Sequence, residues 1–549
     1  MKVFRIFTVV LSVCFLVFMG CSSQKDSEQN IQKFSKVEPV ELATIDLSLS
    51  TDGYSQSVLS NTNEGLYRLG KNEKLEPAGA EGQAIISENG LLYRIFLNKK
   101  AKWSDGKPVV ANDYVYSWQR TVDPKTQSEI VSLFSPVKNA EKIAAGQVPK
   151  EELGIHAVNK YELLIELEKP TPYFSYLLSY PNFFPQRKDI VERYGKLYAM
   201  TSENTVYNGP FCLKGYKGPG ISTSWQLTKN QKYWDKENVS LDVIDTQVVK
   251  DQGTAYNLYK DGKINETYLS GEFYQQNKKN KELITINQTN SFYIQANVSN
   301  SQSIIANKLV REAISYATNR KQLTDHILNN GSIPSESISA KGLAFSPKEH
   351  IDFSEISATK AVYNKQKAHE LWGKYNPDKK PVSVELTLSD TENSKVIGEF
   401  LQAQWQEALP GLTVKITPLP FSMLLEQLQI RNYELVLTGA KPEYPDPTSF
   451  LDYLTTNNPQ NYSGYSNQQV DQLMDEVHNH LGTNKEKRWD TMVKANELVM
   501  QDLPLIPLLQ QRKTYLRNQS VQGIISHSVG AEFDYKQAKI TGVTNHERE

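Results

Sequence analysis

Residues 383–421 contain two strand patterns separated by one helix pattern, and this order is the strongest constraint on the fold. The segments SVELTLSD (383–390) and TVKITPLPF (413–421) alternate apolar and polar residues, as half-buried strands do. Between them, KVIGEFLQAQWQEAL (395–409) is typical of a helix. Strand, helix and strand in this order form a βαβ-like unit, whose two strands lie parallel. The sequence therefore predicts an α/β fold with a partly parallel sheet.

Three other segments have the pattern of core-facing helices. Apolar residues recur on one face of NKLVREAISYATNRKQLTDHIL (307–328) and of SNQQVDQLMDEVHNHL (466–481). In the second of these, Ser466 and Gln469 have the spacing of a capping box. A further helix pattern follows Asn112, whose side chain suits an N-cap.

The length and the charge of the chain limit its class. A chain of 549 residues exceeds what one hydrophobic core usually organises, so we expect two or more lobes. Lysine and arginine (61) nearly balance aspartate and glutamate (62), so the sequence gives no sign of a nucleic-acid partner. Tyrosine is abundant, with 29 residues against 19 phenylalanines, which suits a semi-polar internal cavity.

The first 20 residues have the pattern of a secretory signal. Lys2 and Arg5 precede an apolar run at 6–20, which is shorter than the roughly 20 residues that span a bilayer. We expect residues 1–20 to be removed. Cys21 follows Gly20, and this junction resembles the lipobox of bacterial lipoproteins, in which the cysteine is diacylated (for example with palmitate) and becomes the new N-terminus.

Residues 21–36 are mostly polar and predict a flexible tether. No later stretch is long and apolar enough to span a bilayer, so the body is expected outside the membrane, held there by lipid. The chain has three cysteines. With Cys14 in the leader and Cys21 lipidated, Cys212 is expected to be a buried, inert thiol, and the fold needs no disulfide.

Catalytic and metal patterns are weak. His478 and His480 would point apart on a helix, and no third ligand is near them in the sequence. GYSQS at 53–57 lacks the second glycine of a nucleophile elbow, and GYKGPG at 215–220 lacks the residues of a phosphate-binding loop. The 62 acidic residues leave a glycosidase-type carboxylate pair open, although no spacing singles one out. We expect no metal, no cofactor and no enzyme activity.

One stretch, LTGAKPEYPDPTSFLDYL (437–454), needs an explanation. It leaves an apolar run, places the carboxylate of Glu443 among three prolines, and then resumes with apolar residues. A solvated turn and a ligand site are both compatible with this pattern.

Several segments together are similar to one family. Residues 93–124, YRIFLNKKAKWSDGKPVVANDYVYSWQRTVDP, resemble the signature of the cluster C solute-binding proteins, the oligopeptide-binding proteins of ABC importers. Other segments resemble the same family in the same order: TNEGLYRL, NGPFCLKGY, LTKNQKYWD, LVREAISYATNR, YPDPTSFLD, YSNQQVDQLMDE and LPLIPLLQQRKTYL. The resemblance covers nearly all of the mature chain.

The resemblance implies a two-lobed periplasmic-binding-protein-like fold (type II) with an extra third subdomain. Lobe I would be discontinuous, the lobes would be joined by a hinge, and the ligand would lie enclosed between them. The expected boundaries are 37–63, 190–292 and 518–549 for lobe I, 64–189 for the extra subdomain, and 293–517 for lobe II.

The resemblance also implies a binding site for an extended peptide. An acid in the segment that matches 439–450 pairs with the α-amino group of the ligand in peptide-binding relatives, and Glu443 occupies that position, where many relatives have Asp. The ligand would add as a strand to Thr51, Asp52 and Gly53 on one lobe and to Gly439, Ala440 and Lys441 on the other. Relatives often carry a basic residue at the position of Leu437 and an aromatic residue at that of Ala440, so this pocket is expected to be less polar.

The expected function is an extracytoplasmic solute-binding lipoprotein, monomeric and lipid-anchored at the cell membrane. It would capture oligopeptides by lobe closure and deliver them to an ABC transporter permease. A narrower hypothesis, motivated by Leu437 and Ala440, is a preference for short hydrophobic signalling peptides such as pheromones; a general nutritional binder is the competing view. A secreted hydrolase and a surface chaperone or adhesin on the same scaffold stay as alternatives.

Overall fold

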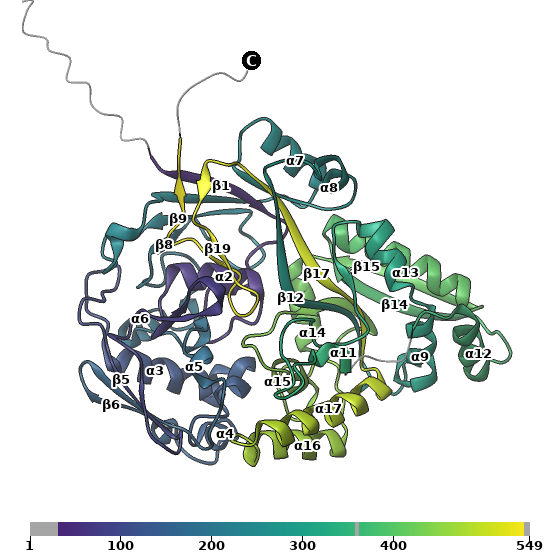
Figure 1. Ribbon diagram of the computed structural model, residues 1–549, viewed down its shortest axis with the longest axis horizontal. Coiled ribbons are helices and arrows are strands. Elements are labelled where there is room, and N and C mark those ends of the chain that lie inside the picture. The colour runs from purple at the N-terminus through teal and green to yellow at the C-terminus, as the bar shows by residue number, and fades with distance from the viewer. Residues whose placement is uncertain (1–30, 357–361, 543–549) are drawn as a thin grey trace, which may run out of the picture.

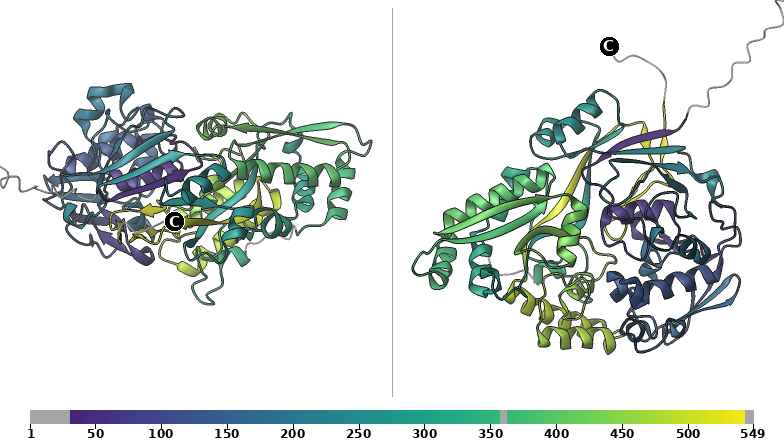
Figure 2. Two further views of the ribbon diagram at one scale, coloured as in Figure 1. Left: turned by 90° about the horizontal axis from the view of Figure 1, so that it is seen from above. Right: turned by 180° about the vertical axis from the view of Figure 1, so that it is seen from behind.

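The computed structural model describes residues 31–356 and 362–542. Figure 1 shows two halves side by side, with two long strands between them, and Figure 2 shows the same division from above and from behind. The predicted leader (1–20), Cys21 and most of the predicted tether lie outside the described residues. No helix of the described residues is long and apolar enough to cross a membrane.

One mixed sheet of 11 strands runs through both halves of the described chain. Its order is β15 (Leu412–Leu419), β14 (Val382–Ser389), β16 (Leu435–Ala440), β12 (Leu283–Ala296), β17 (Leu505–Arg517), β11 (Glu266–Leu269), β1 (Lys33–Glu38), β10 (Val243–Val248), β9 (Ser224–Lys229) and β8 (Phe211–Lys214), with β13 (Ile333–Pro334) paired to β17 off this path. We call β14–β16 with their helices the α13 half, and β1 with β8–β11 and their helices the α2 half.

The predicted βαβ unit is confirmed and builds the outer edge of the α13 half. Strands β14 and β15 pair in parallel from Val382 with Leu412 to Ser389 with Leu419, and α13 (Glu392–Ala408) connects them. Apolar side chains of all three elements share one core with most of the other helices of this half. These are α9 (Lys308–Ala317), α11 (Phe353–Ile356), α12 (Lys365–Tyr375), α15 (Thr448–Leu451), α16 (Gln468–Asn479) and α17 (Lys485–Asp502). The same half includes α10 (Arg320–Gln322) and α14 (Phe421–Gln429), and α14 packs in a smaller apolar cluster with Tyr433 and Val436.

Strands β12 and β17 join the two halves (Figure 1). They pair antiparallel from Leu283 with Leu516 to Asn287 with Arg512, and again from Ser291 with Gln510 onward. The register shifts between these two stretches. Because an extra stretch of chain on one strand bends and twists a ladder, the shift lies where the halves can change their relative angle.

A second, four-stranded sheet lies against the α2 half. It runs in the order β4 (Ile85–Ile86), β5 (Leu92–Phe96), β7 (Glu162–Glu166) and β6 (Ile155–Asn159). Its buried face packs with Trp103 and Trp118 in a core of its own. The helices on this side of the molecule are α2 (Gly53–Thr62), α3 (Ala111–Val122), α4 (Ala140–Ala144), α5 (Phe174–Leu177), α6 (Lys188–Tyr194), α7 (Gln252–Lys260) and α8 (Gly271–Asn277).

The remaining strands form two-stranded ladders. They are β2 (Tyr67–Leu69) with β3 (Leu75–Pro77), β18 (Val521–Gln522) with β21 (Lys539–Ile540), and β19 (Ile525–Ser526) with β20 (Phe533–Asp534).

Two predicted helix caps are wrong by one or two residues. Helix α3 begins at Ala111 after Val110, because the Asp113 carboxylate accepts a hydrogen bond from the Val110 N–H at 3.0 Å, so Asn112 falls inside the first turn. Helix α16 is capped by Asn467, whose side chain accepts from the N–H groups of its first turn, in place of the predicted Ser466.

The predicted tether is too long at its end. Residues 33–36 belong to β1, which pairs in parallel with β10, although the segment is mostly polar. Phe34 is completely buried in the core of the α2 half, and this single aromatic side chain anchors the strand. The thiol of Cys212 on β8 is only partly buried, yet burial raises its pKa to about 11, so it stays protonated near neutral pH.

Candidate functional site

A cavity of about 320 Å³ lies between the α2 half and the α13 half. Its walls come from the loop before α2, from β12, β16 and β17, and from the first turns of α13 and α14. All the residues that the sequence predicted for the site line this one cavity: Thr51, Asp52, Gly53, Leu437, Gly439, Ala440, Lys441 and Glu443.

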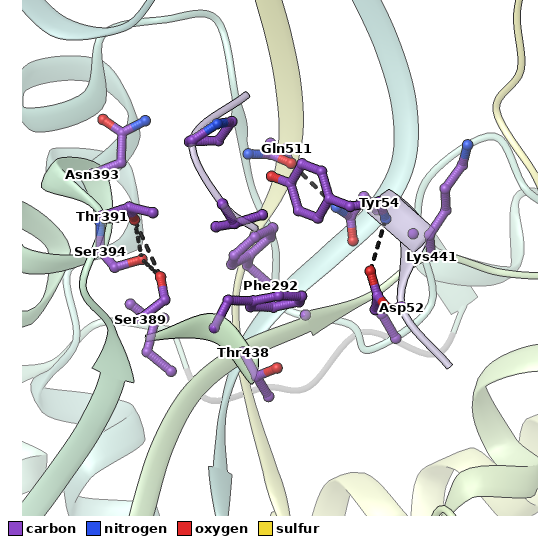
Figure 3. Close-up of a pocket in the computed structure, with 18 of the residues that line it drawn as sticks. Asp52, Tyr54, Phe292, Ser389, Thr391, Asn393, Ser394, Thr438, Lys441 and Gln511 are labelled. Carbon is purple, nitrogen blue, oxygen red and sulfur yellow. Dashed lines mark hydrogen bonds between the residues drawn. The ribbon is translucent and has the colours of Figure 1, made fainter. Parts of the chain in front are cut away.

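On the α2 half, Asp52 shapes the wall. Its Oδ1 caps α2 by accepting hydrogen bonds from the N–H groups of Tyr54 at 3.0 Å and Ser55 at 2.9 Å (Figure 3). Burial raises the pKa of the Asp52 carboxyl. The cap holds Thr51 and Gly53 at the cavity, and a side chain at Gly53 would meet open space.

On the α13 half, strand β16 has a partly unpaired edge. It pairs with β12 from Leu435 to Ala440, but within the described residues its other edge meets β14 only at Leu435 and Val436. The main chain from Leu437 onward therefore has free N–H and C=O groups on the cavity side of the ladder, which is the template for an added strand. Gly439 is required by packing as well, because a Cβ there would lie 2.8 Å from the Ser291 carbonyl oxygen.

Glu443 lies just beyond β16 and is 8% exposed. Its Oε2 accepts a hydrogen bond from Ser449 Oγ at 2.6 Å, and its Oε1 accepts one from the hydroxyl of Tyr453. Burial raises the pKa of this carboxyl above its ordinary value of 4.5, against the lowering effect of the two hydroxyls. Within the described residues Glu443 has no salt bridge, so it is a buried acid without a cation.

The other predicted residues differ in character. Leu437 is buried and belongs to the core of the α13 half as well as to the cavity wall. Lys441 donates a hydrogen bond from Nζ to the carbonyl oxygen of His527 at 2.8 Å, and burial lowers its pKa to about 8. Besides Leu437 and Ala440, the cavity lining includes these apolar residues: Phe292, Leu328, Ile397, Phe421, Leu424, Leu425, Leu428, Leu454, Leu505 and Leu509.

A cluster of three hydroxyl groups, which no sequence motif indicated, lies at the opposite end of the cavity from Asp52 and Lys441 (Figure 3). Ser389 Oγ lies 2.8 Å from Ser394 Oγ, which in turn lies 2.9 Å from Thr391 Oγ1. These residues join the end of β14 to the N-terminus of α13. Ligands of α/β proteins commonly bind at such strand-to-helix junctions, so the predicted βαβ unit could have pointed to them.

Strand β17 also contributes residues that no motif indicated. Lys513 forms a buried salt bridge with Glu532 at 2.5 Å, and Arg512 and Gln511 line the cavity beside it. These side chains reach the cavity only because β17 crosses between the two halves.

The two halves are bonded to each other across the cavity. Lys250 Nζ lies 2.6 Å from Asp390 Oδ2, the N–H of Gln252 donates to Glu392 at 2.9 Å, and Ser270 Oγ donates to Asn393 at 2.6 Å. The first residue of each pair belongs to the α2 half and the second to the α13 half. The structure is therefore a closed form, in which the cavity is shut by direct contacts.

The site has no arrangement for a metal. Among the described residues, no group of three or more His, Cys, Asp or Glu side chains could hold an ion. The described cavity offers instead a partly unpaired strand edge, apolar side chains and a buried carboxylate.

Known proteins are similar to this chain in sequence and in fold. Residues 74–462 match the family described as bacterial extracellular solute-binding proteins, family 5, middle. A dipeptide-binding protein of Lactococcus lactis subsp. cremoris is 33% identical over 547 residues, which are 97% of this chain and 98% of the relative.

Two solved structures are also similar. The structure of Listeria monocytogenes OppA bound to peptide has a TM-score of 0.90 at 37% identity, covering 94% of this chain and 100% of that one. The structure of the pheromone receptor PrgZ has a TM-score of 0.89 at 38% identity, covering 93% and 100%. The expected type II binding-protein fold is confirmed. With the family match over most of its length, the chain belongs to the bacterial extracellular solute-binding proteins, family 5.

Proposed function

We propose that this protein captures extended oligopeptides outside the cytoplasm and hands them to the permease of an ABC transporter. The observation that carries the proposal is the cavity between the two halves, where the free edge of β16 lies near a buried carboxylate without a cation. A peptide provides what this pair lacks: main-chain groups for the strand edge and an α-ammonium group for Glu443.

The site binds the ligand mainly through the main chain of the ligand. Residues 51–53 on the α2 half and 439–441 on the α13 half face the cavity from opposite walls. Main-chain hydrogen bonds are the same for every side chain, so the site tolerates different peptide sequences. The apolar lining around Leu437 and Ala440 supports a preference for hydrophobic peptides, and the likeness to the pheromone receptor PrgZ supports short signalling peptides as ligands.

Capture, in this proposal, works by closure, and this protein makes and breaks no covalent bond in it. The ligand prefers the closed state and shifts the population toward it. Lobe I is assigned to 37–63, 190–292 and 518–549, the extra subdomain to 64–189, and lobe II to 293–517. The mature protein is a monomer, anchored at the outer face of the cell membrane by lipid on Cys21 after removal of residues 1–20.

Isothermal titration of the purified protein with an apolar heptapeptide and with tri-lysine tests the binding function. We expect the heptapeptide to bind more tightly, and small-angle scattering to show a more compact protein once it is bound. Equal affinity for the two peptides would remove the hydrophobic preference. No binding of any member of a peptide library would overturn the function itself, as would hydrolysis of the peptides or binding to unfolded protein without compaction.

A further inference from the structure

The first turn of α2 places two acceptor atoms at the cavity without a donor. Asp52 Oδ2 and Gln56 Oε1 are buried, and neither has a hydrogen-bond partner within the described residues. Both residues line the cavity, and Gln56 is only 1% exposed. Asp52 is the N-cap of α2, Gln56 lies in its first turn, and both residues belong to the same wall of the cavity.

The geometry fixes Gln56 Oε1 as an acceptor, and the ionised carboxylate of Asp52 offers only acceptor atoms. Gln56 Nε2 donates to the Ser50 carbonyl oxygen at 2.9 Å and to Asn182 Oδ1 at 2.8 Å. Asn182 Nδ2 in turn donates to the carbonyl oxygen of Leu47 at 2.6 Å, so neither amide can be reversed without losing hydrogen bonds. The other oxygen of Asp52 is occupied by the helix cap. A buried acceptor without a donor is unfavourable, so this pair needs a donor that the described chain does not provide.

The two carboxylates near this end of the cavity, Asp52 and Glu443, indicate that the missing donor is positively charged. Asp52 has no salt bridge within the described residues, and Glu443 on the opposite half has none either. Tyr180 also lines the cavity, and after burial the charges of Glu443 and Asp52 both raise the pKa of its hydroxyl, so both acids lie in its vicinity. The α-ammonium group of a peptide neutralises one carboxylate and leaves the second without a cation.

We propose that Asp52 and Gln56 form a second cation subsite, which binds the side-chain ammonium or guanidinium group of a basic residue within the first two residues of the peptide. This inference rests on the proposed peptide-binding function and specifies its ligand. The cation lies near the amino end of the peptide because Asp52 and Glu443, the proposed partner of the α-ammonium group, both lie in the vicinity of Tyr180. The apolar residues of α14 and β17 then line the path of the following residues, so the ligand is basic at its start and hydrophobic beyond it.

A walk of one lysine through the peptide tests this subsite. Five hydrophobic pentapeptides carry lysine at one position each, and five controls carry norleucine, which has a similar chain but no amine, at the same position. Isothermal titration of the purified protein is expected to show at least tenfold tighter binding of lysine over norleucine at position 1 or 2, with little difference at positions 3 to 5.

The variant Asp52→Asn separates the subsite from the fold. Asparagine caps a helix as well as aspartate does, so α2 is retained while the charge is lost. We expect Asp52→Asn to bring the affinities for each lysine peptide and its norleucine control within twofold of each other, so that the preference for lysine is lost whatever the affinity for the norleucine series. Glu392→Gln, which removes a carboxylate from the other end of the cavity, serves as the control and is expected to keep the preference.

Three results would overturn the inference. Equal binding of lysine and norleucine peptides by the wild type would mean that ordered water, and no ligand cation, satisfies the two acceptors. A lysine preference that survives in Asp52→Asn would place the cation elsewhere. A preference that peaks at positions 3 to 5 would do the same. None of these results affects the proposed function, which fails if no peptide of either series binds.

Discussion

The environment of Glu443 leads to a specific prediction about peptide affinity. Its carboxylate is buried between two hydroxyl donors, and a ligand ammonium would be its first positive partner among the described residues. Glu443→Gln keeps the size and one acceptor oxygen but removes the charge. A charge-assisted hydrogen bond is worth roughly 1.5–3 kcal/mol, so titration calorimetry should show a loss of about 10- to 100-fold in affinity for peptides with a free amine.

The control for this prediction is N-acetylation of the peptide. Acetylated peptides have no ammonium group, so Glu443→Gln should change their affinity by less than about twofold, well below the tenfold that one charged hydrogen bond represents. Equal weakening of free and acetylated peptides would show that Glu443 supports the wall and does not bind the amine.

The pKa of Glu443 also predicts a pH dependence. In the ligand-free protein burial raises this pKa above 4.5, so the carboxyl is protonated at a higher pH than an ordinary glutamate. A ligand ammonium favours the ionised form and must displace that proton, so affinity should fall as the pH drops through the raised pKa and be constant above it. Ligand-free stability has the opposite sign: the contribution from protonated Glu443 is present at low pH and is lost as the pH rises through the same pKa.

Titrations between pH 4 and pH 7 in two buffers with different heats of ionisation would detect the released proton. This range stays below the pKa of Lys441, which burial places at about 8 and which lines the same cavity. The Glu443→Gln variant should show a weaker dependence on pH. A profile unchanged in this variant would assign the titration to another group, of which Asp52 is the first candidate because burial raises its pKa too.

At the scale of elements, α2 combines a structural cap with a cavity wall. Asp52 Oδ1 satisfies two N–H groups at the start of the helix. Asp52→Ala should therefore cost about 1 kcal/mol of stability, whereas Asp52→Asn should cost much less because asparagine is an equally good cap. Urea unfolding of the ligand-free variants measures both. If the two variants lose the same stability, the charge of Asp52 and not the cap supports the helix.

The contacts between the two halves stabilise the closed form of the whole molecule. Lys250 bridges Asp390 at 2.6 Å and lies 3.7 Å from Glu41, and the three residues shut the cavity only when the halves meet. Lys250→Met leaves the two acids facing each other in the closed form. A partly exposed ion pair contributes about 0.2–1 kcal/mol, so peptide affinity should fall about 1.4- to fivefold through a smaller closed population.

Small-angle scattering checks the cause of that loss. Ligand-free Lys250→Met should be more extended on average than the wild type, while saturating peptide should bring both to the same compact form. Lys348→Met, which breaks an exposed pair with Glu486 away from the cavity, is the matched control and should leave the affinity unchanged. Weaker binding with unchanged scattering would assign Lys250 to direct ligand contact.

The proposed lipid anchor can be tested on the whole chain as well. Cys21→Ser removes the only proposed acylation site, and serine cannot form the thioether to the lipid. We expect the variant to leave the membrane fraction and to incorporate no labelled palmitate, with its peptide affinity unchanged because the residues that line the cavity all lie between Glu38 and Glu532. Continued labelling of the variant would move the anchor to another residue.

The amino-acid sequence alone determined the class of this fold and the position of its acid. Alternation in 383–390 and 413–421 is a local property, because it reflects which face of a strand is buried, and the parallel pairing of β14 with β15 follows from the helix between them. The segments that resemble the family placed all eight predicted site residues, from Thr51 to Glu443, on what proves to be one cavity. Cap positions were less certain, since Asp113 and Asn467 compete with their neighbours for the same N–H groups.

Only the tertiary structure decided how the site is assembled. Asp52 and Glu443 are nearly 400 positions apart in the sequence, and nothing in either segment indicates that both acids lie in the vicinity of Tyr180. The unpaired edge of β16 depends on where its contact with β14 stops, and the closing bond of Lys250 depends on the angle between the halves. These features come from long-range contacts, whose partners are set by the packing of whole layers, and a local pattern of residues contains no information about them.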